Sequence, residues 1–487
     1  MLYSMLGAQT FISGVRLYLQ RHDGEAATVE DFLAAMDEVS DLDLSQFRLW
    51  YQQAGTPLVT VSSRYAPADS SLELTFEQHC PATPGQSQKQ PLHIPCLLGL
   101  LDADGQPLPL QLAGEESSPE PKERVMHLRS ERETLRFVNL PQQPVVSLFR
   151  QFSAPVRVAG DECSDSLAFL LGNDSDSFNR WDAGQRLAQR IILSLVKKPA
   201  SATVADDLQL MVEGVGKVLQ DGSLDPGLAA KLLELPSELY LAQQMAEVDI
   251  EGLYAARRQV RNHLAAGLEE PLRARWQACL DNGPYSVAPE AVGLRSLKNI
   301  CLYYLMAVNS DQTRLLVHDS YWQASNMTDR LAALALLTEG SDPARQEALD
   351  DFYARAGTDP LVLDKWFAVQ ARCRRPDTLK QVRRLMAHPA YQPRNPNRVR
   401  ALIGTFSRVN LLHFHAADGN GYALLGEQII ALDQVNPQLA GFLAGGFSSW
   451  RRYDAKRQQL MKEQLQLIAA LPKLSRDLNE IVTKMLG

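Results

Sequence analysis

Histidine, cysteine and acidic side chains are the groups that could hold a metal ion in this sequence. The commonest zinc peptidase motif is His-Glu-x-x-His, which places two imidazoles on one helix face with a glutamate beside the metal-bound water. None of the nine histidines is followed by glutamate. The closest pair is His413 and His415, with Asp418 nearby, and two ordinary histidines at a helix end are favoured over a metal site. The sequence therefore predicts no catalytic residue and no metal ligand.

Motifs for nucleophiles and nucleotides are also missing from the sequence. It contains no Gly-x-Ser-x-Gly, no Gly-x-Gly-x-x-Gly and no Walker loop, so serine hydrolase, dinucleotide-binding and P-loop functions lack support. Its six cysteines are scattered, and none forms the Cys-x-x-Cys spacing that is typical of zinc or redox sites. We therefore expect reduced thiols and a cytoplasmic protein.

Two arginines, Arg398 and Arg400, follow the turn Asn395-Pro396-Asn397 and are the candidates for contact with a ligand. A buried arginine there would need a carboxylate partner, whereas an arginine facing an internal channel would suit the carboxylate of a peptide. We retain both alternatives, with Arg400 as the first candidate for the substrate channel. A second basic group, Arg451-Arg452 with Lys456-Arg457, is expected to be a solvated helix face, with an anion or carboxylate contact as the alternative.

The elements that position these residues fall into three regions. Residues 1–55 show helical periodicity and are too few to form a usual domain. Residues 56–160 contain short strands separated by turns, with strict alternation over residues 72–77, which favours a β-sandwich. Residues 161–487 are helical throughout and predict an irregular solenoid of the HEAT or armadillo kind.

The first region carries two apolar helix faces that must pack on something. One consists of Phe11, Val15 and Tyr18, and the other of Phe32, Met36 and Val39. Because the region is too short to fold alone, these faces are expected to need a packing partner.

Composition excludes several classes of protein. The 487 residues are 45% hydrophobic and 22% charged, with a net charge of −8, so the chain can bury a core and is not disordered. A basic excess, which is typical of nucleic-acid binders, is missing. No apolar run approaches the ~20 residues that span a bilayer, and the N-terminus does not read as a secretory signal. We expect no nucleic-acid partner and no membrane association.

A series of short runs matches the motifs of one known family, in the family's order: Arg21-His22-Asp23-Gly24, Ala27-Thr28, Asp31-Phe32, Trp50-Tyr51, Gly55-Thr56-Pro57, Ser153-Ala154-Pro155-Val156, Asn326-Met327-Thr328-Asp329, Asp364-Lys365-Trp366-Phe367, Asn395-Pro396-Asn397-Arg398 and Tyr453-Asp454-Ala455-Lys456-Arg457. Together they resemble the C-terminal half of aminopeptidase N, a family of zinc-dependent exopeptidases, in its cytoplasmic bacterial branch. The resemblance extends from Met1 to Gly487.

The resemblance implies a helical tail of a thermolysin-like catalytic domain, a small Ig-like β-sandwich and a helical superhelix. Full-length members carry their zinc ligands and amine-binding motif before the matched part, so no catalytic or metal residue carries over to this chain. Zinc is accordingly expected in the full-length family and no cofactor in this chain.

The function implied is non-catalytic. The chain would cap the active site of an aminopeptidase N and gate the access of short peptides to a zinc centre that it lacks, and alone it would be inactive. Its partners would be the N-terminal, catalytic half and, through the full enzyme, short peptide substrates. The resemblance also implies that the apolar faces of residues 1–55 pack on the rest of the catalytic domain, so part of that surface is expected to be exposed in this chain. The alternative is an autonomous α-solenoid interaction module without peptidase activity.

Overall fold

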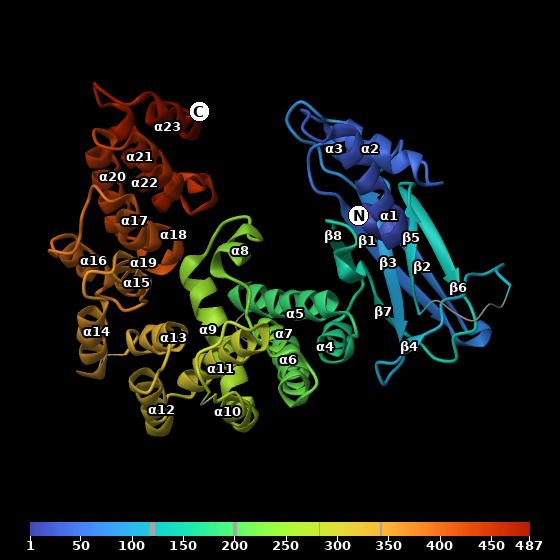
Figure 1. Cartoon of the computed structure of the whole chain (residues 1–487), viewed down its shortest axis with the longest axis horizontal. Coiled ribbons are helices and arrows are strands. Elements are labelled where there is room, and N and C mark those ends of the chain that lie inside the picture. The colour runs from blue at the N-terminus through green and yellow to red at the C-terminus, as the bar shows by residue number, and fades with distance from the viewer. Residues whose placement is uncertain (117–121, 198–201, 282, 341–342) are drawn as a thin grey trace. The chain divides into compact units, whose positions relative to one another are not determined.

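The computed structural model describes residues 1–116, 122–197, 202–281, 283–340 and 343–487 (Figure 1). These residues divide into two compact units. One comprises Met1–Leu187 with Glu213–Val218, and the other comprises Ala188–Val212 with Leu219–Gly487.

The first unit begins with three helices, α1 (Leu2–His22), α2 (Val29–Glu38) and α3 (Leu49–Gln52). Thr28 starts α2 with a capping box, in which its side chain accepts from the Asp31 backbone N–H and the Asp31 carboxylate accepts from the Thr28 backbone N–H. This reciprocal pair satisfies backbone donors that a helix start leaves open.

The three helices share a small hydrophobic core. Its buried members are Leu2, Leu33, Met36, Leu44 and Phe47. The two predicted apolar faces meet at this core, with Phe11 and Val15 packed from α1 and Phe32 from α2. The expectation that these faces pack on a partner outside the chain is therefore wrong for Phe11, Val15, Phe32 and Met36. Periodicity identified both faces correctly, but it does not reveal that two short helices cover each other.

Two other apolar side chains on α1 point outward. Ile12 and Leu19 are 46% and 55% exposed. Ile12 and Leu19 are seven residues apart and lie on one face of the helix. This outer face of α1 is not covered within its own unit.

Two sheets form the β-sandwich of the first unit. One has the order β6-β2-β1-β8 and the other β4-β3-β5, with β7 also paired to β3. The strands are β1 (Leu58–Ala66), β2 (Ser71–His79), β3 (Ile94–Leu101), β4 (Pro107–Leu108), β5 (Glu123–Leu128), β6 (Arg132–Phe137), β7 (Val145–Ser147) and β8 (Arg157–Gly160), with short 3-10 turns η1 (Pro67–Asp69) and η2 (Arg150–Phe152).

The sandwich core follows the predicted alternation. On β2, Leu72, Leu74 and Phe76 are buried, whereas Glu77 is exposed. All eight residues of β3 are buried. Helix α1 contacts this strand, and the Trp50 indole N–H donates to the His93 carbonyl just before it, at 2.9 Å. The α1–α3 helices therefore dock on the sheet that contains β3.

Helices make up the described chain beyond the sandwich. They are α4 (Ser164–Asn173), α5 (Ser177–Lys197), α6 (Ala202–Gln220), α7 (Pro226–Leu232), α8 (Glu238–Gln243), α9 (Ile250–Gly267), α10 (Glu269–Ala278), α11 (Pro289–Val308), α12 (Asp311–Trp322), α13 (Met327–Leu337), α14 (Pro343–Ala356), α15 (Pro360–Ala371), α16 (Thr378–Met386), α17 (Pro396–Val399), η3 (Arg400–Gly404), α18 (Thr405–Val409), α19 (Leu411–Phe414), α20 (Asn420–Asp433), α21 (Pro437–Ala444), η4 (Gly445–Phe447), η5 (Trp450–Arg452), α22 (Ala455–Ala469) and α23 (Arg476–Leu486).

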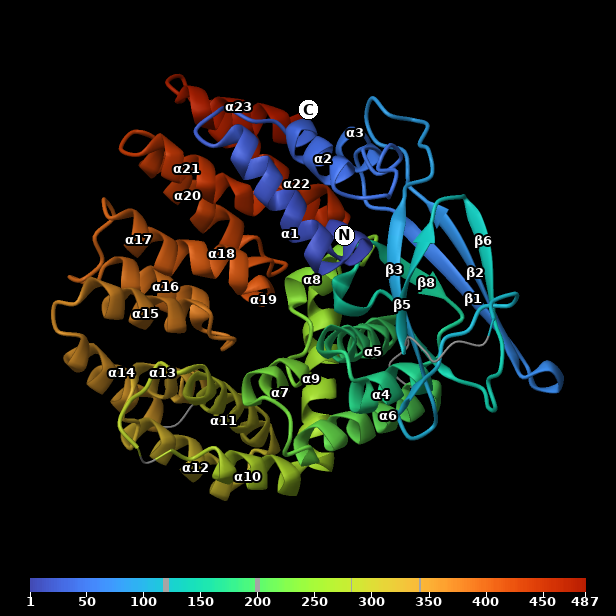
Figure 2. The ribbon, with the colours of Figure 1, turned by 45° about the vertical axis from the view of Figure 1, so that its right-hand side comes forward.

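Within the second unit, the helices from α9 to α23 follow one another along a curved path (Figure 2). Several begin at a polar side chain that accepts a backbone hydrogen bond, as at Asp249 before α9 and Ser475 before α23. Such caps satisfy open N–H groups of the first turn. In the described parts of the chain, no helix combines the length and the apolar run that crossing a bilayer requires.

The two ends of this curved path are joined through the basic group at residues 451–457. The Val248 N–H donates to the Arg452 carbonyl at 2.8 Å, and the Arg452 guanidinium donates to the Ala242 carbonyl at 3.1 Å. Arg457 is buried and forms ion pairs with Glu251 and Asp454. The interpretation of this group as a solvated helix face is wrong for Arg457, because a carboxylate more than 200 residues earlier neutralises it.

Candidate functional site: the arginines of residues 395–409

The local sequence fixes where this site begins. The Asn395 side-chain oxygen accepts from the backbone N–H groups of Asn397 and Arg398, at 3.0 and 3.4 Å, and Pro396 occupies the first helical position of α17. Asparagine is a strong helix cap, and proline is favoured directly after it. Arg398 therefore lies in α17 and Arg400 directly follows it. The two side chains point in different directions.

Arg398 lies in the interior, with its side chain 4% exposed. Its Nε is 2.6 Å from Asp364 Oδ1, its Nη1 donates to the Ala390 carbonyl at 2.8 Å, and its guanidinium lies 5.0 Å from the centre of the Phe367 ring. These contacts are the ones expected if Arg398 is a buried arginine with a carboxylate partner. A contact of Arg398 with substrate stays a prediction.

Arg400 is exposed and starts η3, a π-helical turn between α17 and α18. Single π-helical turns are rare and occur frequently at functional sites. The Arg400 guanidinium lies 5.3 Å from the centre of the Phe442 ring, and its Nη1 is 3.4 Å from Asn397 Oδ1. The channel role predicted for Arg400 stays a prediction.

Arg408, which the sequence analysis did not single out, lies on the same ring. Its guanidinium is 4.0 Å from the centre of Phe442, and it donates to the Phe442 carbonyl at 3.1 Å. Partial burial lowers the pKa of Arg408. Over the described ranges, neither Arg400 nor Arg408 forms an ion pair, so this pair presents uncompensated positive charge that could bind a carboxylate.

Of the histidine pair, His415 has a structural explanation. His415 is buried, with one ring nitrogen 2.9 Å from the Tyr422 hydroxyl and the other 3.0 Å from the Tyr453 hydroxyl. A neutral imidazole has one donor and one acceptor, so two hydroxyls satisfy it. Asp418 instead accepts from Asn420, at 2.6 and 3.0 Å.

The potential metal-binding side chains of the described residues do not form a metal site. Among the parts of the chain that the structure describes, no group of three or more histidine, cysteine, aspartate or glutamate side chains could hold a metal ion. Zinc needs three or four such ligands at fixed geometry. The described residues therefore do not fit the zinc ion that the resemblance implies for the full-length family.

Comparisons with known proteins agree with this architecture. Residues 55–161 match a family model described as a domain of unknown function (DUF3458) with an Ig-like fold, and residues 164–487 match one described as a domain of unknown function (DUF3458_C) with ARM repeats. The chain is 38% identical to Aminopeptidase N of Escherichia coli K12 and 40% identical to Aminopeptidase N of Caulobacter vibrioides, over 100% of this chain and 55% of each relative.

A solved structure gives the same result. The crystal structure of Legionella pneumophila aminopeptidase A, in complex with aspartic acid, superposes with a TM-score of 0.83 at 29% identity, over 99% of this chain and 55% of that chain. The class is thus an Ig-like β domain followed by an ARM-repeat helical domain. The chain belongs to the aminopeptidase N family and corresponds to the C-terminal part of these enzymes.

Both the predicted family and the predicted fold class are confirmed, including the irregular solenoid. The chain spans about half the length of the relatives that it matches, 55% in each case. The comparisons do not favour the alternative of an autonomous solenoid module. The division at residues 1–55, 56–160 and 161–487 stays a prediction.

Proposed function

We propose that this chain is the non-catalytic C-terminal portion of an aminopeptidase N, which caps the active site and gates the access of short peptides to a zinc centre held by the catalytic part. The match of the whole chain to 55% of each aminopeptidase N relative carries this proposal. Its place of action would be the cytoplasm.

The chain's own residues supply the gate in this proposal. Arg400 and Arg408 flank Phe442 without carboxylate partners in the described chain, and a guanidinium binds a carboxylate through two parallel hydrogen bonds. A short peptide that travels toward the zinc centre would meet these arginines with its C-terminal carboxylate. Arg398 would hold the supporting helix in place through Asp364.

Kinetics of the enzyme assembled from this chain and a catalytic part would test the gate. Arg400→Ala and Arg408→Ala should each raise KM for short peptides about tenfold, the scale of one lost charge-assisted contact. The same peptides with an amidated C-terminus should show no change, because they carry no carboxylate. The control is Arg394→Ala, since Arg394 is an exposed arginine of the same loop region. Equal effects on free and amidated peptides would contradict the proposed gate.

The partner in this proposal is the N-terminal, catalytic part of the enzyme. The outer face of α1, with Ile12 and Leu19 exposed, supplies apolar surface that such a partner would cover. Exposed apolar side chains that gather on one helix face are typical of interaction sites.

A further inference from the structure

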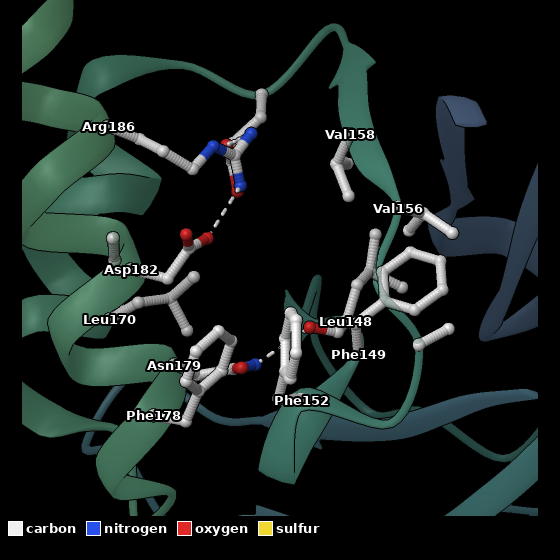
Figure 3. A pocket seen from close by; sticks show the side chains of 13 residues that line it. Leu148, Phe149, Phe152, Val156, Val158, Leu170, Phe178, Asn179, Asp182 and Arg186 are labelled. Atoms are coloured by element: carbon white, nitrogen blue, oxygen red, sulfur yellow. Dashed lines mark hydrogen bonds and ion pairs between the residues drawn. The ribbon is translucent and has the colours of Figure 1, made fainter. Parts of the chain in front are cut away.

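A small pocket lies inside the first unit, between helices α4 and α5 and the segment that runs from η2 into β8. It has a volume of about 80 Å³. Figure 3 shows Asp182 and Arg186 of α5 on one side and Val156 and Val158 on the other. Binding sites for whole small molecules usually have several hundred Å³, so this pocket suits a single group of side-chain size.

The walls of the pocket are mainly apolar, and its lining includes two aromatic rings. Val156, Val158 and Leu170 supply aliphatic surface. The rings of Phe152 and Phe178 are 5.0 Å apart between centres, and Phe152 is 53% exposed. A ligand would therefore need a hydrocarbon portion, and a cation could also lie over the aromatic faces.

The polar lining carries net negative charge. Arg186 Nη2 is 2.5 Å from Glu162 Oε2, whereas Arg186 Nη1 is 3.7 Å from Asp182 Oδ2. One arginine thus faces two carboxylates and makes its close contact with Glu162. Burial in the pocket wall raises the pKa of Asp182, although its side chain is still 39% exposed. A cation placed beside Asp182 would favour its charged form.

The backbone of the wall is held in an uncommon conformation. Phe149, Gln151 and Phe152 have φ of 55°, 56° and 53°, a left-handed region that costs non-glycine residues roughly 1–3 kcal/mol each and that recurs at ligand clamps. The Asp176 carboxylate accepts from the Gln151 N–H at 3.2 Å, and Asn179 Nδ2 donates to the Leu148 carbonyl at 2.9 Å. The wall is therefore preorganised by α5.

We propose that this pocket binds a primary alkylammonium group. The ammonium would pair with Asp182 and face the rings of Phe152 and Phe178, while its methylene stem would lie on Val156 and Val158. The group could come from a free alkylamine or from a lysine side chain of a peptide. This site is separate from the Arg400–Arg408 gate, whose charge has the opposite sign.

Calorimetric titration of the full chain tests the proposal with n-butylammonium as the probe and butyrate as its anionic counterpart. We expect n-butylammonium to bind and butyrate not to bind. Asp182→Asn, which keeps the shape and removes the charge, should weaken n-butylammonium binding about tenfold or more. Asp165→Asn makes the same charge change at an exposed position of α4 and should have no effect.

Titration with Nα-acetyl-lysine amide then separates the two sources of the ammonium group. A pocket for lysine side chains binds both probes, whereas a pocket for free amines binds only n-butylammonium.

Several results would overturn this assignment: no binding of n-butylammonium to the wild-type chain, equal binding of butyrate, or unchanged affinity in folded Asp182→Asn. If Asp182→Asn does not fold by thermal melt, Phe178→Leu replaces it. That variant removes one aromatic face and should weaken n-butylammonium binding several-fold, about 3- to 5-fold by the strength of a cation–π contact. Full affinity in folded Phe178→Leu would contradict the proposal in the same way.

Discussion

At the scale of single residues, two arginines separated by one position have different surroundings. Arg398 is buried against Asp364, whereas Arg400 is exposed over Phe442. Removing one partner of a buried ion pair leaves an uncompensated charge, while an exposed cation loses little. The same substitution should therefore give different outcomes at the two positions.

We expect Arg398→Ala to lower the free energy of unfolding by about 3–5 kcal/mol, because it leaves the Asp364 carboxylate without its partner. Arg400→Ala should change it by less than about 0.5 kcal/mol. Urea unfolding of both variants measures this difference. A control variant that replaces Arg398 and Asp364 together by Met and Leu should recover much of the loss. Equal effects at both positions would refute the assignment of Arg398 as the structural member.

The sequence alone could not separate these alternatives. Asp364 lies 34 residues before Arg398, and the Phe442 ring shared by Arg400 and Arg408 comes from α21, another 34 residues beyond Arg408. Periodicity predicts which face of a helix is apolar, but not which distant side chain meets it. The runs that match family motifs could be identified from the sequence. The structure adds that two of them, residues 364–367 and 395–398, are joined by one ion pair.

The burial of His415 predicts how the stability of the chain depends on pH. Burial and the nearby Arg457 guanidinium lower its pKa from 6.5 to about 3. Because the unfolded chain binds this proton more tightly, the stability linked to His415 is fully present above pH 6.5 and is lost progressively as the pH falls toward the folded pKa, by up to about 1.4 kcal/mol per pH unit.

His415→Gln should remove this pH-dependent contribution to stability. Glutamine offers a donor and an acceptor to the two tyrosine hydroxyls and does not titrate. The unfolding free energy of the wild type should fall between about pH 7 and about pH 5. In the variant this fall should be smaller by about 1–2 kcal/mol. Parallel pH dependence in the two proteins would show that His415 does not titrate as its burial requires.

At the scale of elements, the strands were predictable because they alternate and are separated by turns. Residues 72–77, for example, alternate strictly in sequence and lie within β2 (Ser71–His79). The segment around η2 was not predictable as a left-handed turn. It contains no glycine, and its conformation depends on the side chains of Asp176, directly before α5, and Asn179, in the first turn of α5.

The close crossing of α1 and α2 gives a prediction at this scale. A Cβ at Gly14 would lie 2.4 Å from Met36 Sδ, so a larger side chain at Gly14 forces the buried Met36 side chain to move. Gly14→Val should destabilise the α1–α3 core by about 1–3 kcal/mol, seen as faster hydrogen exchange over residues 1–55. Gly24→Val is not a suitable control because Gly24 has a φ of 77°, so Ser13→Val, at an exposed position of α1, serves instead and should leave exchange unchanged.

At the scale of the whole molecule, the chain corresponds to 55% of each aminopeptidase N relative. Its described residues offer no metal-binding group. We therefore expect the purified chain to hold no stoichiometric zinc, because a zinc site needs at least three protein ligands in fixed geometry. Elemental analysis after dialysis measures this directly. About one equivalent of retained zinc would refute the non-catalytic assignment.

The most direct test of the central claim is association with a catalytic part. The chain would be mixed with the separately produced N-terminal part of the Escherichia coli relative and examined by sedimentation and by peptidase assay. We expect a one-to-one complex with aminopeptidase activity, weakened by Ile12→Asp with Leu19→Asp on the outer face of α1 and unaffected by Leu467→Asp, another exposed leucine. A chain that stays separate from the catalytic part, with no gain in peptidase activity on mixing, would contradict the account.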